Sequence, residues 1–142
     1  MSVETIERAI GRDIVGAAFD VRRNTGRGML EKFYENALAY ELNERGHEVE
    51  CQVVIPAIYK GKEIGDAYRA DNIVDKKVII ELKAISSMEG IQFCQLYTYL
   101  KLSLYRLGYL INFGAYDFII GNLNDEEPPY ELGIYPLSNN HP

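Results

Sequence analysis

The chain has 142 residues, of which 47% are hydrophobic and 25% charged, a balance typical of one globular domain. It contains no apolar run of about 18 residues and no basic leader before an apolar core, which argues against a membrane-spanning helix and a secretion signal. The net charge of −6 argues against tight, non-specific binding of nucleic acid, but leaves binding through a local basic patch or a bound cation open.

The cysteines indicate a reducing environment. Cys51 and Cys94 fall within predicted apolar elements, so we expect reduced core residues and not a disulfide. Together with the polar N-terminus, this predicts a cytoplasmic protein. No Cys/His cluster with the spacing of a zinc site is present.

Two helices are predicted at the start of the chain. Residues 3–20 place apolar side chains at helical spacing, and residues 29–45 carry an apolar stripe. Gly46 directly after the second helix is typical of a helix C-terminus. The loop predicted between the helices, residues 21–28, contains a basic cluster made of Arg22, Arg23 and Arg27.

Strands are predicted next. The segment Val49–Tyr59 is rich in Val and Ile, and Pro56 within it favours an edge strand or a bulge. The following stretch YRADNIVDKKVIIELKA, residues 68–84, predicts two short strands joined by a polar turn at residues 75–77. We expect these two strands to form an antiparallel hairpin.

A further helix is predicted over Ile91–Leu107, with strands over Tyr109–Phe113 and Phe118–Leu123. The strand, helix and strand between residues 78 and 113 predict a parallel crossover. From residue 124 the sequence is polar and rich in proline. We therefore expect a domain over residues 1–123 and an irregular C-terminal tail over residues 124–142.

Three charged side chains stand out on the predicted hairpin. Strand alternation places Glu81 and Lys83 on one face, and a three-residue turn places Asp71 opposite Glu81. Two carboxylates this close repel each other unless a cation lies between them, and hard oxygen ligands suit Mg²⁺. A lysine beside such an ion can orient water and stabilise a phosphoryl group. On these residues alone, a solvated strand face with a weak ion pair fits equally well.

The order Asp71, nine residues, Glu81-x-Lys83 resembles the PD-(D/E)XK nuclease superfamily, with Ala70 where the family name has proline. The resemblance implies an α/β fold with a restriction-endonuclease-like core, a mixed β-sheet flanked by helices. It further implies that Asp71 and Glu81 bind Mg²⁺ or Mn²⁺, with the carbonyl of Leu82 as a third ligand. Lys83 would position or activate the attacking water.

A second motif lies at the start of the second predicted helix. Gly28, Glu31 and Tyr34 spell G-x-x-E-x-x-Y, which resembles the signature of the GxxExxY protein family, a branch of the same superfamily. Several superfamily members place a glutamate of the first core helix beside the metal, so the resemblance implies this role for Glu31. From the residues alone, Glu31 is a carboxylate that complements the helix dipole.

A third motif, Gln95-x-x-x-Tyr99, lies on the predicted third helix. It resembles a motif of the exonuclease-like branches of the superfamily, which implies that Gln95 helps to hold the active-site region or the substrate. An amide among so many apolar neighbours also needs a hydrogen-bond partner. We expect Tyr99 to be a core residue.

These features support two functions from different classes. The first is a metal-dependent nuclease that hydrolyses phosphodiester bonds in DNA or RNA. The alternative is a catalytically idle module of the same fold that binds nucleic acid or a protein partner, which the acidic net charge favours. Both are compatible with a homodimer in which apolar residues of the tail, Tyr130, Ile134 and Tyr135, close the interface.

Overall fold

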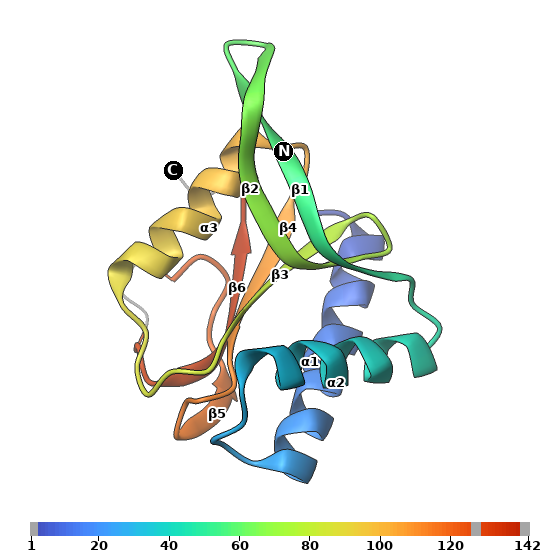
Figure 1. The fold of residues 1–142 in the computed structure, drawn as a ribbon, viewed down its shortest axis with the longest axis vertical. Coiled ribbons are helices and arrows are strands. Elements are labelled where there is room, and N and C mark those ends of the chain that lie inside the picture. Colours follow the sequence, from blue (N-terminus) through green and yellow to red (C-terminus); the bar gives the residue numbers. More distant parts are fainter. Residues whose placement is uncertain (1–2, 126–128, 140–142) are drawn as a thin grey trace.

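The computed structural model describes residues 3–125 and 129–139. In chain order, the elements are α1 (Thr5–Thr25), α2 (Glu31–Glu44), β1 (Val49–Tyr59), β2 (Lys62–Val74), β3 (Val78–Lys83), α3 (Gly90–Leu102), β4 (Leu107–Asn112), β5 (Asp117–Ile120) and β6 (Leu132–Ser138). The strands form a mixed sheet in the order β1-β2-β3-β4-β6-β5, with helices on both faces (Figure 1). The predicted α/β class is confirmed. Within the described ranges, no helix has both the length and the apolar character that a membrane span requires.

Two buried apolar clusters hold the helices against the sheet. On one face, Ile14 of α1 belongs to the same cluster as Ile80 of β3. On the other face, Leu96 of α3 belongs to the same cluster as Ile79. Because side chains alternate along a strand, Glu81 shares the face of Ile79. Packing on both faces therefore fixes β3 in the middle of the sheet.

Strands β3 and β4 are parallel neighbours, with Lys83 opposite Asn112, so the predicted crossover through α3 is confirmed. Every residue of β4 is buried, as are most residues of β3. Such burial on both faces explains the nearly continuous aliphatic sequences of the two strands. Because the strands are parallel, their C-terminal ends lie at the same end of the sheet, where Lys83 is the last residue of β3.

Strands β1 and β2 continue beyond the sheet as a two-stranded ribbon (Figure 1). The predicted bounds of β1 are confirmed, and Pro56 lies at a register shift on this edge strand, where a missing N–H is tolerated. The predicted strand from residue 68 is only part of β2, which begins at Lys62. Much of the ribbon is exposed, so the alternation that reveals a strand is weak there.

Several predicted boundaries and burials differ from the structure. Helix α1 extends to Thr25, five residues further than expected, because its last turn is polar and carries no apolar period. Helix α3 ends at Leu102, and Leu107 opens β4. A run of aliphatic residues fits a buried strand as well as a helix. Cys51 and Cys94 are free but exposed, so their assignment to the core is wrong.

The predicted irregular tail over residues 124–142 is wrong for its central part, although residues 126–128 and 140–142 lie outside the described ranges. Residues 132–138 form β6, which pairs antiparallel with β4 and parallel with β5. Pro136 fits because its carbonyl accepts from the Asn124 N–H, so the missing N–H would not have faced β4. Ile134 and Tyr135 are buried in this sheet, which removes them as contacts of a homodimer.

Candidate active site

Asp71 and Glu81 lie together where β2 and β3 separate. The two strands pair as far as Asn72 and Ile80, and the next step of the same register places Asp71 opposite Glu81. The ladder ends before that step. The Asp71 carboxylate instead accepts a hydrogen bond from the backbone N–H of Leu82 at 2.8 Å. The divergence of the strands thus opens a gap in which both carboxylates lie.

The backbone of Leu82 faces the same gap. In a strand, the N–H and the carbonyl of one residue point to the same side. Since the N–H of Leu82 points toward Asp71, its carbonyl lies on the side from which β2 has departed. Leu82 and Asp71 both line a cavity of about 230 Å³. The structure therefore brings a carbonyl oxygen to the carboxylates.

The Glu81 carboxyl is held in an unfavourable environment for a negative charge. Its pKa is raised to about 9, chiefly by burial and also by the hydrogen bond and the charge of the neighbouring Asp71 carboxylate. The hydrogen bond from Tyr68 and the charge of Lys83 act in the opposite direction but are smaller. At neutral pH the pair of carboxylates therefore retains a proton unless a cation takes its place.

Two tyrosines support Glu81. The hydroxyl of Tyr68 donates a hydrogen bond to Oε2 of Glu81, and the Tyr68 ring stacks on Tyr99 with 3.5 Å between ring centroids. Tyr99 is partly exposed and not the core residue that we expected. Burial and then the nearby charge of Glu81 raise the pKa of Tyr99. Residue spacing does not predict the hydrogen bond from Tyr68 to Glu81, because Tyr68 lies beyond the residues of β2 that pair with β3.

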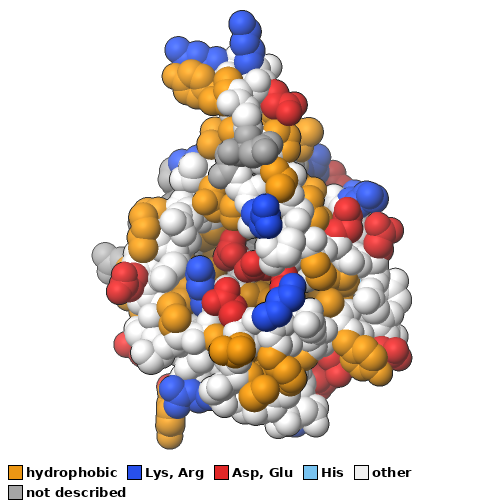
Figure 2. All heavy atoms as spheres, in the orientation of Figure 1, with side chains coloured by type: hydrophobic (Ala, Val, Ile, Leu, Met, Phe, Trp, Pro, Cys, Tyr) orange, Lys and Arg blue, Asp and Glu red, His pale blue; other side chains and the backbone are white. Residues whose placement is uncertain are grey.

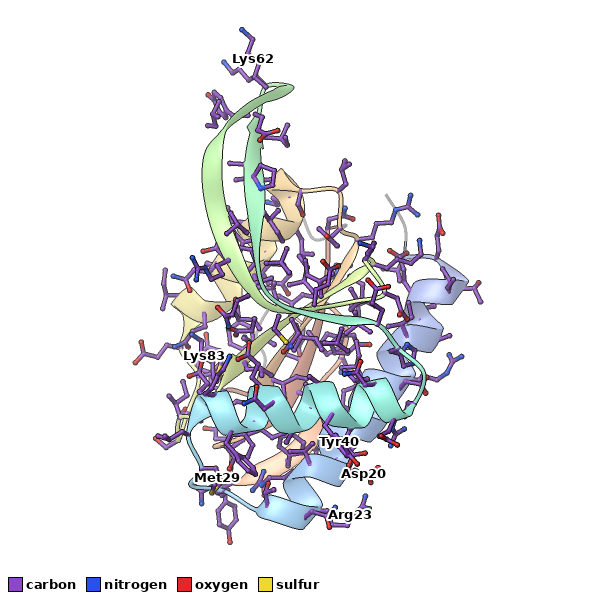
Figure 3. All side chains as sticks on the ribbon, turned by 45° about the vertical axis from the view of Figure 1, so that its right-hand side comes forward. Asp20, Arg23, Met29, Tyr40, Lys62 and Lys83 are labelled. Atoms are coloured by element: carbon purple, nitrogen blue, oxygen red, sulfur yellow. The ribbon has the colours of Figure 1, made fainter. Side chains whose placement is uncertain are left out.

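Glu31 and Lys83 border the same opening. Figure 3 shows Lys83 beside the N-terminal end of α2, and Glu31 is the first residue of that helix. Burial raises the pKa of Glu31, the charge of Lys83 opposes this rise, and Asp71 adds to it. Glu31 also lines the cavity with Asp71 and Leu82. The residues predicted from the hairpin and from the start of α2 thus converge.

The remaining residues of the second motif explain how Glu31 is placed. Gly28 has φ of 97°, a conformation that residues with a side chain rarely adopt. The Tyr34 hydroxyl donates to the carbonyl of Gly26 at 2.7 Å and accepts from the N–H of Met29 at 3.2 Å. Tyr34 is fully buried. Gly28 and Tyr34 therefore fix the loop that leads into Glu31.

Glu35 and Gln52 belong to the site but were not among the predicted residues. The Gln52 amide donates to Glu35 at 2.7 Å and to Asp71 at 3.3 Å. Glu35 is 3% exposed and also accepts from Lys32 at 2.7 Å. Gln52 has φ of 54°, which costs about 1–3 kcal/mol for a residue other than glycine. Glu35 follows Glu31 by one helical turn, and that spacing was a usable signal.

Gln95 lies at the margin of this arrangement. It is exposed on α3, so the expectation of an amide among apolar neighbours is wrong. A largely apolar helix still has a solvent-facing side, and Gln95 lies there. It precedes Tyr99 by one turn on the same side of α3. Its assignment to the site rests on this position alone.

The site offers few atoms that could bind a metal ion, and those atoms are hard oxygen ligands. Figure 2 shows acidic side chains gathered in a hollow near the middle of one face, with basic side chains around it. Among residues 3–125 and 129–139, no three Asp, Glu, His or Cys side chains converge closely enough to hold a metal ion unaided. Two carboxylates and a carbonyl fit Mg²⁺ or Mn²⁺, which retain several waters, better than ions that need a complete protein cage.

A comparison with protein families gives a match over most of the chain. The family model of the PD-(D/E)XK nuclease superfamily matches residues 8–120, well over half of the chain. The matched segment includes most of α1, all of α2, the ribbon, β3 and the two tyrosines beside Glu81. No curated protein and no solved structure matches the chain.

Proposed function

Since the chain belongs to the PD-(D/E)XK nuclease superfamily, we propose that it hydrolyses phosphodiester bonds in nucleic acid with a divalent cation, Mg²⁺ or Mn²⁺. The observation that carries the proposal is the meeting of Asp71 and Glu81 at the gap between β2 and β3. The raised pKa of Glu81 adds support, because a cation would stabilise two neighbouring carboxylates.

The carboxylates of Asp71 and Glu81 and the carbonyl of Leu82 would hold the cation. When bound, the cation would neutralise charge on the phosphoryl group and acidify a water molecule. The Lys83 ammonium shares the face of Glu81 and would orient the attacking water. Glu31 borders the same opening and would hold further waters by hydrogen bonds.

Two groups of neighbours would keep the carboxylates in place. Tyr68 donates to Glu81 and is itself held by its stack on Tyr99. Gln52 of β1, the neighbour of β2 on its other edge, donates to Asp71. Support of this kind matters because a misplacement of about 1 Å is enough to slow catalysis strongly. We propose that Gln95, one turn from Tyr99, contacts substrate at the rim.

We further propose that the chain is a member of the GxxExxY branch of the superfamily. The conformation of Gly28 and the two hydrogen bonds of the Tyr34 hydroxyl give each fixed residue of that motif a distinct task in placing Glu31. The domain would extend to Ser138 rather than end at residue 123, because β6 lies between β4 and β5.

A cleavage assay tests the proposed activity. Single- and double-stranded DNA and RNA are incubated with the protein in Mg²⁺, in Mn²⁺ or in EDTA. We expect metal-dependent cleavage that is lost in Asp71→Asn and in Lys83→Ala. Lys62→Ala is the matched control, because Lys62 lies at the tip of the ribbon, far from Lys83 (Figure 3). Equal background from wild type and both variants would refute the activity and favour the idle module.

A further inference from the structure

Two arginines contact Tyr116 in the loop between β4 and β5, one over its ring and one at its backbone carbonyl. The Arg27 guanidinium lies over the ring of Tyr116 at 5.5 Å, and Arg22 donates to the backbone carbonyl of Tyr116 at 3.4 Å. The Arg22 guanidinium also covers the ring of Phe118 at 5.0 Å. Tyr116 itself is 77% exposed. We call Arg22, Arg27 and Tyr116 the arginine–tyrosine shelf.

The shelf carries positive charge that the protein does not compensate. Within residues 3–125 and 129–139, neither Arg22 nor Arg27 forms an ion pair. Nη1 of Arg22 is buried without a hydrogen-bond partner. Arg23, the third member of the basic cluster, differs: it pairs with Asp20 and lies beside it, away from Lys83 (Figure 3). Two uncompensated cations in an acidic chain point to an anionic ligand.

The shelf is fastened to the strand end that carries Lys83. The Phe113 N–H donates to the carbonyl of Lys83 at 2.9 Å, and Arg27 donates to the carbonyl of Gly114 at 3.0 Å. A side chain at Gly114 would lie 2.3 Å from the carbonyl oxygen of Ile85, so the loop after β4 packs directly on the end of β3. A ligand on the shelf would therefore extend into the opening at Lys83.

We propose that the arginine–tyrosine shelf binds an unpaired stretch of the nucleic-acid substrate next to the phosphodiester that is cut. This deepens the proposed function and rests on it for the identity of the substrate. An exposed ring backed by a guanidinium offers a flat face for one base, and the arginines suit the flanking phosphates. Bases inside a duplex are already stacked on each other. The shelf thus selects single strands, overhangs or flaps, with weak preference for sequence.

Binding measured without catalysis tests the shelf. The probe is a fluorescent oligothymidylate of about 10 nucleotides in EDTA, read by anisotropy against a duplex of equal length. We expect Tyr116→Ala to weaken single-strand binding about 5- to 100-fold, and Tyr116→Phe to retain it. Arg27→Gln should weaken binding and lower the salt dependence by about 0.7 in the slope of log K against log salt.

Matched controls and competitors make the outcome decisive. Tyr40→Ala removes another exposed tyrosine, 64% exposed on α2, and Arg23→Gln removes the paired arginine; both should bind as wild type. Unchanged binding in Tyr116→Ala, tighter binding of the duplex, or equal displacement by polyglutamate would each overturn the shelf. Because these measurements contain EDTA, they are independent of cleavage. Absent cleavage with intact binding would refute the proposed activity alone.

Discussion

The Asp71 carboxylate accepts a hydrogen bond from the backbone N–H of Leu82 at the point where β2 separates from β3. One side chain thus replaces a ladder hydrogen bond and keeps its strand in contact with β3. The same carboxylate is a proposed metal ligand. The structural role of Asp71 and its proposed catalytic role are therefore combined in one carboxylate, and substitutions of different chemistry separate them.

We predict that Asp71→Asn loses cleavage by at least about 100-fold while the protein stays folded, because the amide oxygen still accepts from Leu82 but binds a cation poorly. Asp71→Ala also leaves the N–H of Leu82 without a partner, which costs about 1–3 kcal/mol in the free energy of unfolding. Urea unfolding of both variants checks this. Equal destabilisation by Asn and Ala would contradict the role of the hydrogen bond.

The raised pKa of Glu81 predicts a pH-dependent stability that a divalent cation removes. The folded-state pKa of about 9 lies above the ordinary value of 4.5, so the associated stability is complete below pH 4.5 and is lost as pH rises toward 9. Magnesium at a hundredfold its Kd should raise the Tm by about 5–10 °C at pH 8, and less at pH 6.

Glu81→Gln is the matched variant for this measurement. It should be at least as stable as wild type at pH 8 without metal, because an amide does not repel Asp71. It should also show no thermal shift with magnesium and no magnesium binding by isothermal titration calorimetry. An equal magnesium shift in both proteins would place the cation elsewhere.

Tyr68→Phe is expected to disturb Glu81 without removing it. The hydrogen bond from Tyr68 lowers the pKa of Glu81, so its loss should raise that pKa further and move the acid limb of the pH–rate profile to higher pH. We expect kcat to fall about 10-fold with little change in KM. Tyr99→Phe keeps the stacked ring and serves as the control. An unchanged pH profile in Tyr68→Phe would show that its hydroxyl is not required.

Gln52 is predicted to act as a positioning residue. Gln52→Ala removes the donor to Asp71 and Glu35, and we expect the affinity for Mg²⁺ or Mn²⁺ to fall about 10-fold. Gln52→Gly also loses the amide but relieves the backbone conformation, so it should unfold at higher urea than Gln52→Ala. Calorimetry and urea unfolding separate the two effects. Wild-type metal affinity in both variants would refute the assignment.

His47 offers a pH effect remote from the site. Burial lowers its pKa, but hydrogen bonds to Asp75 at 2.6 Å and to Asp13 at 2.7 Å outweigh burial, and the net pKa is raised. Its contribution to stability is therefore complete below pH 6.5 and fades as pH rises through the folded-state pKa. At saturating magnesium, His47→Gln should flatten the dependence of the unfolding free energy on pH between pH 6.5 and the folded-state pKa of His47. A curve identical to wild type would contradict this.

Local sequence patterns predict much of the fold and part of the candidate site. Alternation along β3 and the length of the turn before it determine the faces of Asp71, Glu81 and Lys83, and both follow from spacing. Spacing does not specify which distant segments touch. Tyr68 of β2 donates to Glu81 of β3, and Gln52 lies across from Asp71 in the pairing of β1 with β2; both contacts depend on how separate strands pair.

The tail shows a different limit of local patterns. Residues 132–138 include Pro136, which disfavours a central strand, and only the partners of β6 make the position acceptable. Likewise, the aliphatic run through Leu107 satisfies a helix and a buried strand equally, and the neighbouring strands decide between them. Residue preferences do not contain this information, because it concerns which distant segments of the chain pair with each other.

The position of β6 between β4 and β5 also has a consequence for biosynthesis. These residues leave the ribosome after every other described element of the sheet, and until they do, the outer edge of β4 has no neighbour. The nascent chain can assemble α1, α2 and β1–β4, but β5 has nothing to join. Until β6 is synthesised, the partly made sheet therefore has an unpaired, strongly aliphatic β4 edge, which is a site for aggregation with other chains.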